Sequence, residues 1–477
     1  MSKQSFLSDD KRLSRRQFLI GSGTVLSAAI LVACAPAGQA PAAGAAGGAA
    51  AKPADAKAPT PQPTVAINQY GKSDHPVVVW HGLGGADGAT FAKMLQQYAD
   101  QNPDVGVSSE LYNWDVFFQK FPTAVAAGTP PDWAIFHAAE VPQMTSQGLM
   151  QPVDDIFFSS GDLPKEDFGK AIMDVITIEG KTMCVPFDNH GWMQFVNTKV
   201  IKDAGLDPTK LPKNGAEFVD FALKVTTDEA GKHPNDAGFN PDKIKVWAIH
   251  DSWIRFTFPS TMWQFGGGAI SPDQKKALLD SDQSIAAIQY WHDLMYKHKV
   301  CPPMAPGRLS PADLMKTDSL AIMWDGTWSL NFFKDNPDLE KHTTGAGLIP
   351  LSPDGKGANK IDSHIMCIPT GVKQDGIDRA KKLIKWLSDN GKTWATSGQI
   401  PARLSVQKDP DVQAIWSVKA AAEEFNTTGH TEVPHKAFIE IQTAWETAVS
   451  AALTNTTPLP QALKDGAKSI QEILDRP

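Results

Sequence analysis

The sequence predicts an α/β fold in which mainly parallel strands alternate with flanking helices. Runs of β-branched residues are followed by stretches whose apolar residues recur at helical spacing, and turns rich in glycine or proline separate them. The chain also has no internal repeat of solenoid length and no long coiled coil. In open α/β sheets ligands bind beyond the carboxyl ends of the strands, so the turns are where a site is expected.

The first unit of this pattern lies near the start of the expected globular part. Residues 75–80 read as a strand that ends at a glycine-containing turn, residues 81–85. Residues 90–101 follow with apolar side chains at helical spacing, and residues 105–111 read as a second strand. This succession is a strand, turn, helix, strand unit.

The alternation then continues along the chain. We expect a helix over residues 116–127, a strand over 133–137 after Pro130-Pro131-Asp132, and a helix over 141–146. Residues 459–473 form an amphipathic pattern and predict a C-terminal helix.

The first 33 residues have the composition of an export signal. Arg15 and Arg16 precede an apolar run over residues 18–32, which is shorter than the roughly 20 residues that a spanning helix needs. The arginine pair resembles a twin-arginine signal, although signals of the Sec route also contain paired arginines. Leu31-Val32-Ala33-Cys34 resembles the lipidation site of bacterial lipoproteins, so we expect the mature chain to begin at a lipidated Cys34.

Alanine, proline and glycine dominate the segment that follows Cys34. Such a composition cannot bury enough apolar surface to offset the entropy of ordering, so it predicts a flexible tether. We therefore assign residues 34–73 to the lipidated cysteine and a linker that lifts the following domain off a membrane surface.

The composition excludes some classes of function. With 477 residues and 42% hydrophobic residues the chain can build two or three domains, and a net charge of −8 gives no electrostatic footprint for nucleic acid. Four cysteines lack metal-type spacing, so two of Cys184, Cys301 and Cys367 could form at most one disulfide. Fourteen tryptophans against five tyrosines are the more unusual feature, and packing is the ordinary explanation for most of them.

Enzyme and metal motifs find no support. The turn at residues 81–85 could serve as an oxyanion hole, but the chain contains no G-x-S-x-G nucleophile elbow. Gly71-Lys72-Ser73 lacks the first glycine of a phosphate loop. Pairs among the twelve histidines, such as His430 with His435 or His190 with His250, lack close helical spacing, so we expect no catalytic residue, no metal site and no cofactor.

From Val77 to Leu474 the chain resembles the family 1 extracellular solute-binding proteins of bacterial ABC importers, a group that includes sugar- and glycerol-3-phosphate-binding proteins. Each motif is weak alone, but their joint order is specific. The motifs are Val79-Trp80-His81-Gly82, Tyr98-Ala99-Asp100-Gln101-Asn102-Pro103, Ala126-Ala127-Gly128-Thr129-Pro130-Pro131-Asp132-Trp133, Gln147-Gly148-Leu149, Val185-Pro186-Phe187, Val196-Asn197-Thr198, Gln264-Phe265-Gly266-Gly267, Gly326-Thr327-Trp328 and Pro401-Ala402-Arg403-Leu404. One departure is Asp362-Ser363-His364, where members usually carry glycines.

The resemblance implies a two-lobed periplasmic-binding-protein fold of type II, with discontinuous lobes and ligand trapped by hinge closure. Residues 74–188 and 363–405 would form lobe 1, and residues 189–362 and 406–477 would form lobe 2. The expected crossings lie near residues 188–192, 348–364 and 405. The implied protein is a monomer on the outer face of the cytoplasmic membrane that works with permease subunits.

A sugar site needs flat aromatic platforms and a surrounding set of hydrogen-bonding groups, because sugars present an apolar face and a rim of hydroxyls. Trp328 stands where family members often place a stacking tryptophan, and Trp114 stands where relatives place an aromatic contact. Trp253, which we expect to open a helix, is a third candidate. Packing in the core is the alternative for each.

Six polar side chains complete the predicted site. His137 ends an expected strand, and residues 188–190 lie in a stretch that reaches the ligand in several relatives. Unpaired buried polar groups cost roughly 1–3 kcal/mol each, so such side chains set specificity. The polar candidates are His137, Asp188, Asn189, His190, His364 and Arg403.

The expected function is therefore capture of a carbohydrate, in particular an oligosaccharide, for an importer. A phosphorylated polyol such as glycerol-3-phosphate is an alternative that would need a converging base, for which Arg403 and Arg255 are the candidates. A sensor that passes ligand information to a membrane partner and a secreted hydrolase are further alternatives.

Overall fold

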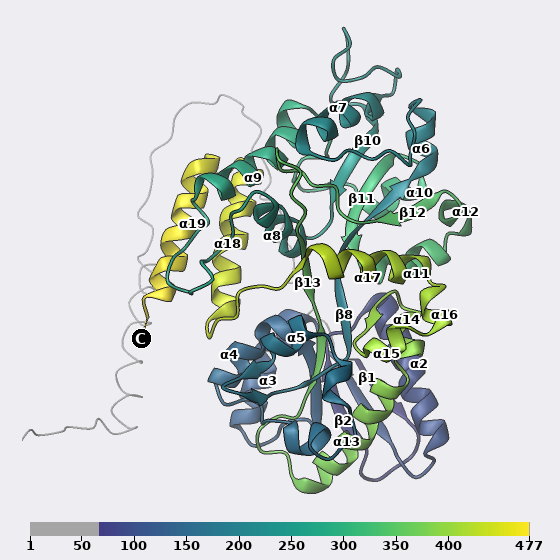
Figure 1. Cartoon of the computed structure of the whole chain (residues 1–477), viewed down its shortest axis with the longest axis vertical. Helices are drawn as coiled ribbons and strands as arrows, with labels where there is room; N and C mark the ends of the chain where they lie inside the picture. The colour runs from purple at the N-terminus through teal and green to yellow at the C-terminus, as the bar shows by residue number, and fades with distance from the viewer. Residues whose placement is uncertain (1–65, 477) are drawn as a thin grey trace, which may run out of the picture. The chain divides into compact units, whose positions relative to one another are not determined.

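The computed structural model describes residues 66–476, and these form two mixed sheets with helices on their faces (Figure 1). The leader with Arg15, Arg16 and Cys34, and most of the predicted linker, lie outside the described residues. Among the described residues, every helix is too short or too polar to span a bilayer.

The first lobe is built on a six-stranded sheet of order β1-β3-β2-β4-β14-β7. Its strands are β1 (Ala66–Tyr70), β2 (Val77–His81), β3 (Val107–Leu111), β4 (Trp133–His137), β7 (Val185–Pro186) and β14 (His364–Cys367). Its helices are α2 (Gly85–Gln101), α3 (Trp114–Ala126), α4 (Val141–Ser146), α5 (Lys170–Val175), α13 (Gln374–Asp389) and α14 (Gly391–Ala395). The short strands β5 (Thr177–Ile178) and β6 (Lys181–Thr182) pair only with each other.

The second lobe is built on an eight-stranded sheet around the ten-residue strand β8. Its strands are β8 (Asp188–Asn197), β9 (Thr227–Asp228), β10 (Ile244–Asp251), β11 (Leu320–Gly326), β12 (Thr343–Ala346), β13 (Asn359–Asp362), β15 (Ile400–Pro401) and β16 (Gly429–His430). Its longer helices are α7 (Gly215–Val225), α8 (Ile254–Gln264), α9 (Asp282–His292), α17 (Trp416–Thr428), α18 (Phe438–Leu453) and α19 (Leu459–Leu474). Short helices are α6 (Thr198–Asp203), α10 (Pro311–Lys316), α11 (Leu330–Lys334), α12 (Pro337–Glu340), α15 (Leu404–Gln407) and α16 (Pro410–Gln413).

Each lobe has its own hydrophobic core. The first core gathers apolar side chains from residues 77–187 and 365–402, with Phe91 and Trp133 among the largest. The second gathers side chains from residues 192–351 and 441–473, with Trp291 and Trp445 among the largest. Helices α18 and α19 lie side by side against α9 (Figure 1).

The predicted α/β class is confirmed, and so are the strand over residues 133–137 and the helix over 141–146. Helix α2 begins at Gly85, five residues before the predicted start, because the small residues Gly85, Ala86, Gly88 and Ala89 give its first turn no clear apolar period. The predicted C-terminal helix ends one residue later, at Leu474.

The expectation of mainly parallel strands is wrong in detail. Parallel pairing joins β2 to β3 and β4, β10 to β11, and β13 to β16, whereas the other neighbours in both sheets are antiparallel. The reason is connectivity, because β8 and β14 enter their sheets from the opposite lobe instead of returning through a helix on the same face.

Residues 66–70, which we expected within the linker, form the edge strand β1. They pair antiparallel with β3 from Ala66–Leu111 to Tyr70–Val107. The strand is largely exposed, so its sequence has little of the apolar pattern that marks a buried strand.

Two crossings between the sheets lie next to each other. Phe187 separates β7 of the first sheet from β8 of the second, and Ser363 separates β13 of the second from β14 of the first. The backbone N–H of Phe187 donates to the carbonyl of His364 at 2.8 Å. The Ser363 hydroxyl donates to the carbonyl of Asp188 at 2.5 Å. The two crossing strands are therefore bonded together where the lobes meet.

Candidate functional site

Three imidazole rings meet beside the two crossings, each from a different strand. His137 ends β4, His190 lies at the start of β8, and His364 opens β14. Their ring centroids are 5.7 Å apart for His137 and His190, 5.2 Å for His137 and His364, and 4.3 Å for His190 and His364. Strand register explains the meeting, because His364 pairs with His137 and Asp362 pairs with His190. We call these three residues the histidine cluster.

A buried carboxylate orients two rings of the cluster. Asp188 is fully buried, and its Oδ1 and Oδ2 accept from Nδ1 of His190 at 3.0 Å and Nδ1 of His364 at 2.7 Å. The same carboxylate accepts from the backbone N–H of His364 at 2.9 Å and from the indole of Trp394 at 2.8 Å. Four donors therefore hold Asp188 in one position.

Charge is distributed unevenly over this group. Burial acts to raise the pKa of the Asp188 carboxyl, but the charge of His364 and hydrogen bonds from both imidazoles outweigh burial and lower it. Burial opposes the charged form of His364, yet the negative charge of Asp188 prevails and raises the pKa of that ring. Burial and repulsion from His364 lower the pKa of His190 to about 3. Of the two rings bonded to Asp188, His364 therefore holds its second proton more strongly than His190 does.

The third ring has its own carboxylate. Glu140 lies on the short helix Ala138–Glu140 that follows β4, and its Oε2 is 3.4 Å from Nδ1 of His137. The same oxygen accepts from the backbone N–H of His137 at 3.1 Å. His137 is the most exposed of the three rings, with 20% of its side chain accessible.

An indole from the first lobe covers one side of the histidine cluster. Trp114 begins α3, where Asn113 caps the helix by accepting from the N–H of Asp115. Its ring lies 4.5 Å from that of His137 and is stacked over His364 at 6.4 Å with an interplanar angle of 16°. Trp114 lies over the backbone of Gly82, where a Cβ atom would be 2.3 Å from the indole.

An indole from the second lobe lies on another side of the same cluster. Trp328 follows β11 in the short helix Thr327–Ser329, and its ring is 6.0 Å from His190. It lies over the backbone of Gly326, where a Cβ atom would again be 2.3 Å from the ring. Both tryptophans therefore depend on a glycine that leaves room for a flat ring.

The sequence-predicted candidates divide into two groups. The structure brings together six of them: Trp114, His137, Asp188, His190, Trp328 and His364. Asn189 is half-buried on β8 and pairs through its backbone with Ile400. Trp253 precedes α8 with 54% of its surface exposed and contacts none of the cluster rings.

Arg403 lies away from the histidine cluster and is already paired. Its Nε donates to Asp167 at 2.5 Å and its Nη1 to Asp389 at 3.3 Å, and its guanidinium lies 5.8 Å above the ring of Phe168. Arg255, the other basic candidate, donates from Nε to Glu446 at 2.5 Å. The charge of each guanidinium is therefore already balanced by a carboxylate.

Two aromatic neighbours of the site were missed by sequence reasoning. Phe256 of α8 lies 5.5 Å from Trp328 and 6.1 Å from His190, and Trp192 of β8 lies 5.7 Å from Trp328. Phe256 is three residues after Trp253, so helical spacing places it on the adjacent turn. The sequence signal that could have identified Phe256 is therefore its helical spacing from the candidate Trp253.

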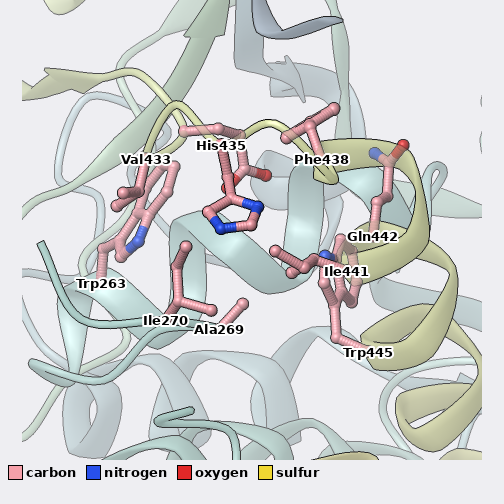
Figure 2. Close-up of a pocket in the computed structure, with 10 residues that line it drawn as sticks. Trp263, Ala269, Ile270, Val433, His435, Phe438, Ile441, Gln442 and Trp445 are labelled. Carbon is pink, nitrogen blue, oxygen red and sulfur yellow. The ribbon is translucent and has the colours of Figure 1, made fainter. Parts of the chain in front are cut away.

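A separate small cavity lies between α8 and α18, lined by residues that include Trp263, His435 and Trp445. Figure 2 shows the ring of His435 lying between Val433 and Ile441. The volume of this cavity is about 20 Å³, which is room for one water molecule and not for a sugar.

The chain matches the family model for bacterial extracellular solute-binding proteins over residues 82–393. It is 23% identical over 360 residues to the maltotriose-binding protein of Pyrococcus abyssi, with 71% of this chain and 68% of that protein covered. Maltose-bound MalE3 of T. maritima superposes with a TM-score of 0.71 at 22% identity, covering 83% of this chain and 99% of that one.

A solute-binding protein of Thermotoga lettingae bound to α-D-tagatose has a TM-score of 0.70 at 21% identity, covering 84% of this chain and all of that one. These likenesses establish the two-lobed fold. The family match over residues 82–393 spans both sheets and includes all three residues of the histidine cluster. The chain therefore belongs to the bacterial extracellular solute-binding proteins.

Proposed function

We propose that the protein is the substrate-binding component of an ABC importer and captures a carbohydrate, in particular an oligosaccharide. The observation that carries the proposal is the placement of Trp114 from the first lobe and Trp328 from the second beside one polar cluster. Relatives whose names specify maltotriose, maltose and tagatose support the same class of solute.

The chemistry of the site suits a sugar. Indoles bury large apolar areas and can stack on the C–H face of a pyranose, while imidazoles bond its hydroxyls. Because the candidates come from both lobes, a solute that contacts both favours a closed state to the extent of its differential affinity for that state. We propose the lobe boundaries at residues 188 and 363 and the return near residue 405 as the pivots of this closure.

The tether belongs to the same proposal. Export through the leader, with its twin-arginine pair, and lipidation of Cys34 would hold the binding domain at the outer face of the membrane as a monomer near its permease. Labelling with a fatty-acid probe tests this step. Label on the wild type and none on Cys34→Ser supports it, and equal label on both contradicts it.

Capture without catalysis is also part of the proposal. Arg403 and Arg255 are each paired with carboxylates, which disfavours a phosphorylated polyol as the solute. A hydrolase would convert its glycoside. Recovery of unchanged solute in stoichiometric amount after incubation distinguishes the two functions.

The direct test is a thermal-shift panel on the purified chain in EDTA, using maltose, maltotriose, mannobiose, tagatose and glycerol-3-phosphate. A ligand at 100 times its dissociation constant stabilises by about 2.7 kcal/mol, which is measurable. Trp114→Ala and Trp328→Ala should abolish the shift. Trp386→Ala, whose indole donates to Gln101 at 2.8 Å in the first lobe, is the matched control. If no sugar moves the melting temperature, the carbohydrate proposal fails.

A further inference from the structure

The histidine cluster has the donor set of a metal site. His137, His190 and His364 can each offer one ring nitrogen so that the three atoms lie within 4.8 Å of one another. In a tetrahedral zinc site with Zn–N bonds of about 2.0–2.1 Å, such nitrogens lie roughly 3.4 Å apart. Moving each nitrogen inward by about 1 Å or less would bring the set to that geometry.

In each of the three rings one nitrogen faces a carboxylate, which leaves the other nitrogen for a metal. Nδ1 of His190 and Nδ1 of His364 both face Asp188, and Nδ1 of His137 faces Glu140. A carboxylate on the outer nitrogen fixes the tautomer of a ligating histidine and raises its basicity, as in carboxylate–histidine–zinc arrangements. Each ring of the cluster has such a carboxylate beside Nδ1, so Nε2 is the nitrogen left to bind a metal, which would displace any proton held there.

The scaffold around the cluster is rigid. The rings come from three strands, β4, β8 and β14, and not from loops. Asp188 is itself held by Trp394 and by the backbone of His364, and Glu140 is buried with 6% exposure. Sites on strands with fixed outer partners keep the geometry that a metal needs.

The candidate ligands among the described residues are three histidines, and the neighbouring carboxylates of Asp188 and Glu140 face Nδ1 of the rings. Three imidazoles with an open fourth position are the ligand set of zinc sites that keep an exchangeable position for water or an added oxygen ligand. Trp114 and Trp328 lie next to the cluster, so the open position would be within reach of a bound solute.

We propose that His137, His190 and His364 form a site for a divalent transition-metal ion of the zinc class, with one coordination position left for an oxygen ligand. The proposal goes beyond carbohydrate capture and does not depend on it, because the ion is bound by the protein alone. The sequence does not reveal the site, because the three histidines are far apart in the chain. They come together only where the chain crosses between the sheets at Phe187 and Ser363.

The test is calorimetric titration of the EDTA-dialysed full chain with ZnCl2 and no sugar. One zinc per chain is expected for the wild type. His137→Ala and His364→Asn should each lose stoichiometric binding, and Glu140→Gln should weaken it about 10- to 100-fold because it removes an outer-shell carboxylate. Cobalt(II) in place of zinc should give the intense visible bands of a four-coordinate ion.

The matched control is His292→Ala. Its ring is 22% exposed, close to the 20% of His137, and bonds to Asn455 away from the cluster. Circular dichroism confirms that each variant is folded. Failure of the wild type to bind one zinc, binding that persists in both cluster variants, or loss in His292→Ala overturns the proposal. If the protein binds zinc but no sugar, only the carbohydrate function is contradicted. If it binds a sugar but no zinc, only the metal site is contradicted.

Discussion

The indole of Trp114 lies so close to the backbone of Gly82 that a Cβ atom on residue 82 would be 2.3 Å from the ring. Gly82→Ala must therefore displace the indole. Overpacking of this kind costs about 1–3 kcal/mol, and loss of a stacking contact costs a further 0.5–1.5 kcal/mol of binding, about three- to tenfold in affinity. Gly84→Ala is the control, because a Cβ there meets nothing within 4 Å. Equal sugar affinity in both variants would show that Trp114 does not form a platform.

The ion pair of Lys360 and Glu432 predicts a large effect on stability. Their atoms are 2.9 Å apart, with side-chain exposures of 3% and 12%. Glu432→Gln removes the ion-pair partner of a buried ammonium, and breaking such a pair costs about 3–5 kcal/mol. Glu472→Gln breaks an exposed pair with Lys468 and should change the free energy of unfolding by less than about 0.5 kcal/mol. Urea denaturation of the two variants measures the difference. A similar small change in both would mean that water reaches Lys360.

His250 predicts a loss of stability in mild acid. It is buried, its Nε2 donates to the carbonyl of Leu309 at 3.1 Å, and burial followed by repulsion from Arg308 lowers its pKa to about 4. The unfolded chain, with a pKa near 6.5, binds the proton first, so stability is complete above that pH and falls as the pH drops toward 4.

Between pH 7 and pH 5 the titration of this ring should lower the free energy of unfolding by about 2 kcal/mol. In His250→Gln the amide can still donate to Leu309 but cannot titrate. Its unfolding free energy should fall by about 2 kcal/mol less than that of the wild type over the same interval. Parallel pH profiles for the two proteins would contradict the assignment.

Three thiols should be unreactive in the native protein. Cys184, Cys301 and Cys367 are free and fully buried, and burial raises the pKa of each thiol. A Cys34→Ser chain should therefore give no colour with a thiol reagent when folded and three equivalents in denaturant. Fewer than three equivalents in non-reducing denaturant would indicate a disulfide instead.

Arg403 should contribute to stability and not to binding. Its guanidinium joins Asp167 and Asp389 and covers Phe168. Arg403→Ala should lower the free energy of unfolding by about 1–3 kcal/mol while sugar affinity stays within a factor of two of wild type. A selective loss of glycerol-3-phosphate binding in this variant would revive the phosphorylated polyol as the solute.

Local residue patterns predicted the elements that do not depend on pairing with a distant segment. The strand over residues 133–137 and the helix over 141–146 could each be predicted from the residue types and spacing of a few neighbouring positions. The exposed strand β1 was missed because its pairing with β3, and not an apolar pattern, makes it a strand. The strand directions were wrong because they depend on crossings at residues 187 and 363, which no local pattern reveals.

The candidate site shows the same division. Trp114 and Trp328 could be singled out because each follows a strand at a position where the resemblance to the family implies an aromatic contact. That His137 and His364 would be paired across β4 and β14 depends on register, so the cluster as a unit could not be predicted. Trp253 precedes α8 and Phe256 lies in its first turn, and only the packing of α8 against β8 decides which of them faces the cluster.

Asp188 separates what can be redesigned in this protein from what cannot. Four donors from three chain segments end on its two oxygens, so its replacement would release β8, β14 and α14 at once. Trp114 and Trp328 instead lie over the backbones of Gly82 and Gly326 and take no part in these hydrogen bonds. A biosensor for a new solute should therefore be evolved at the two indoles, with Asp188 left unchanged because it joins the two crossing strands.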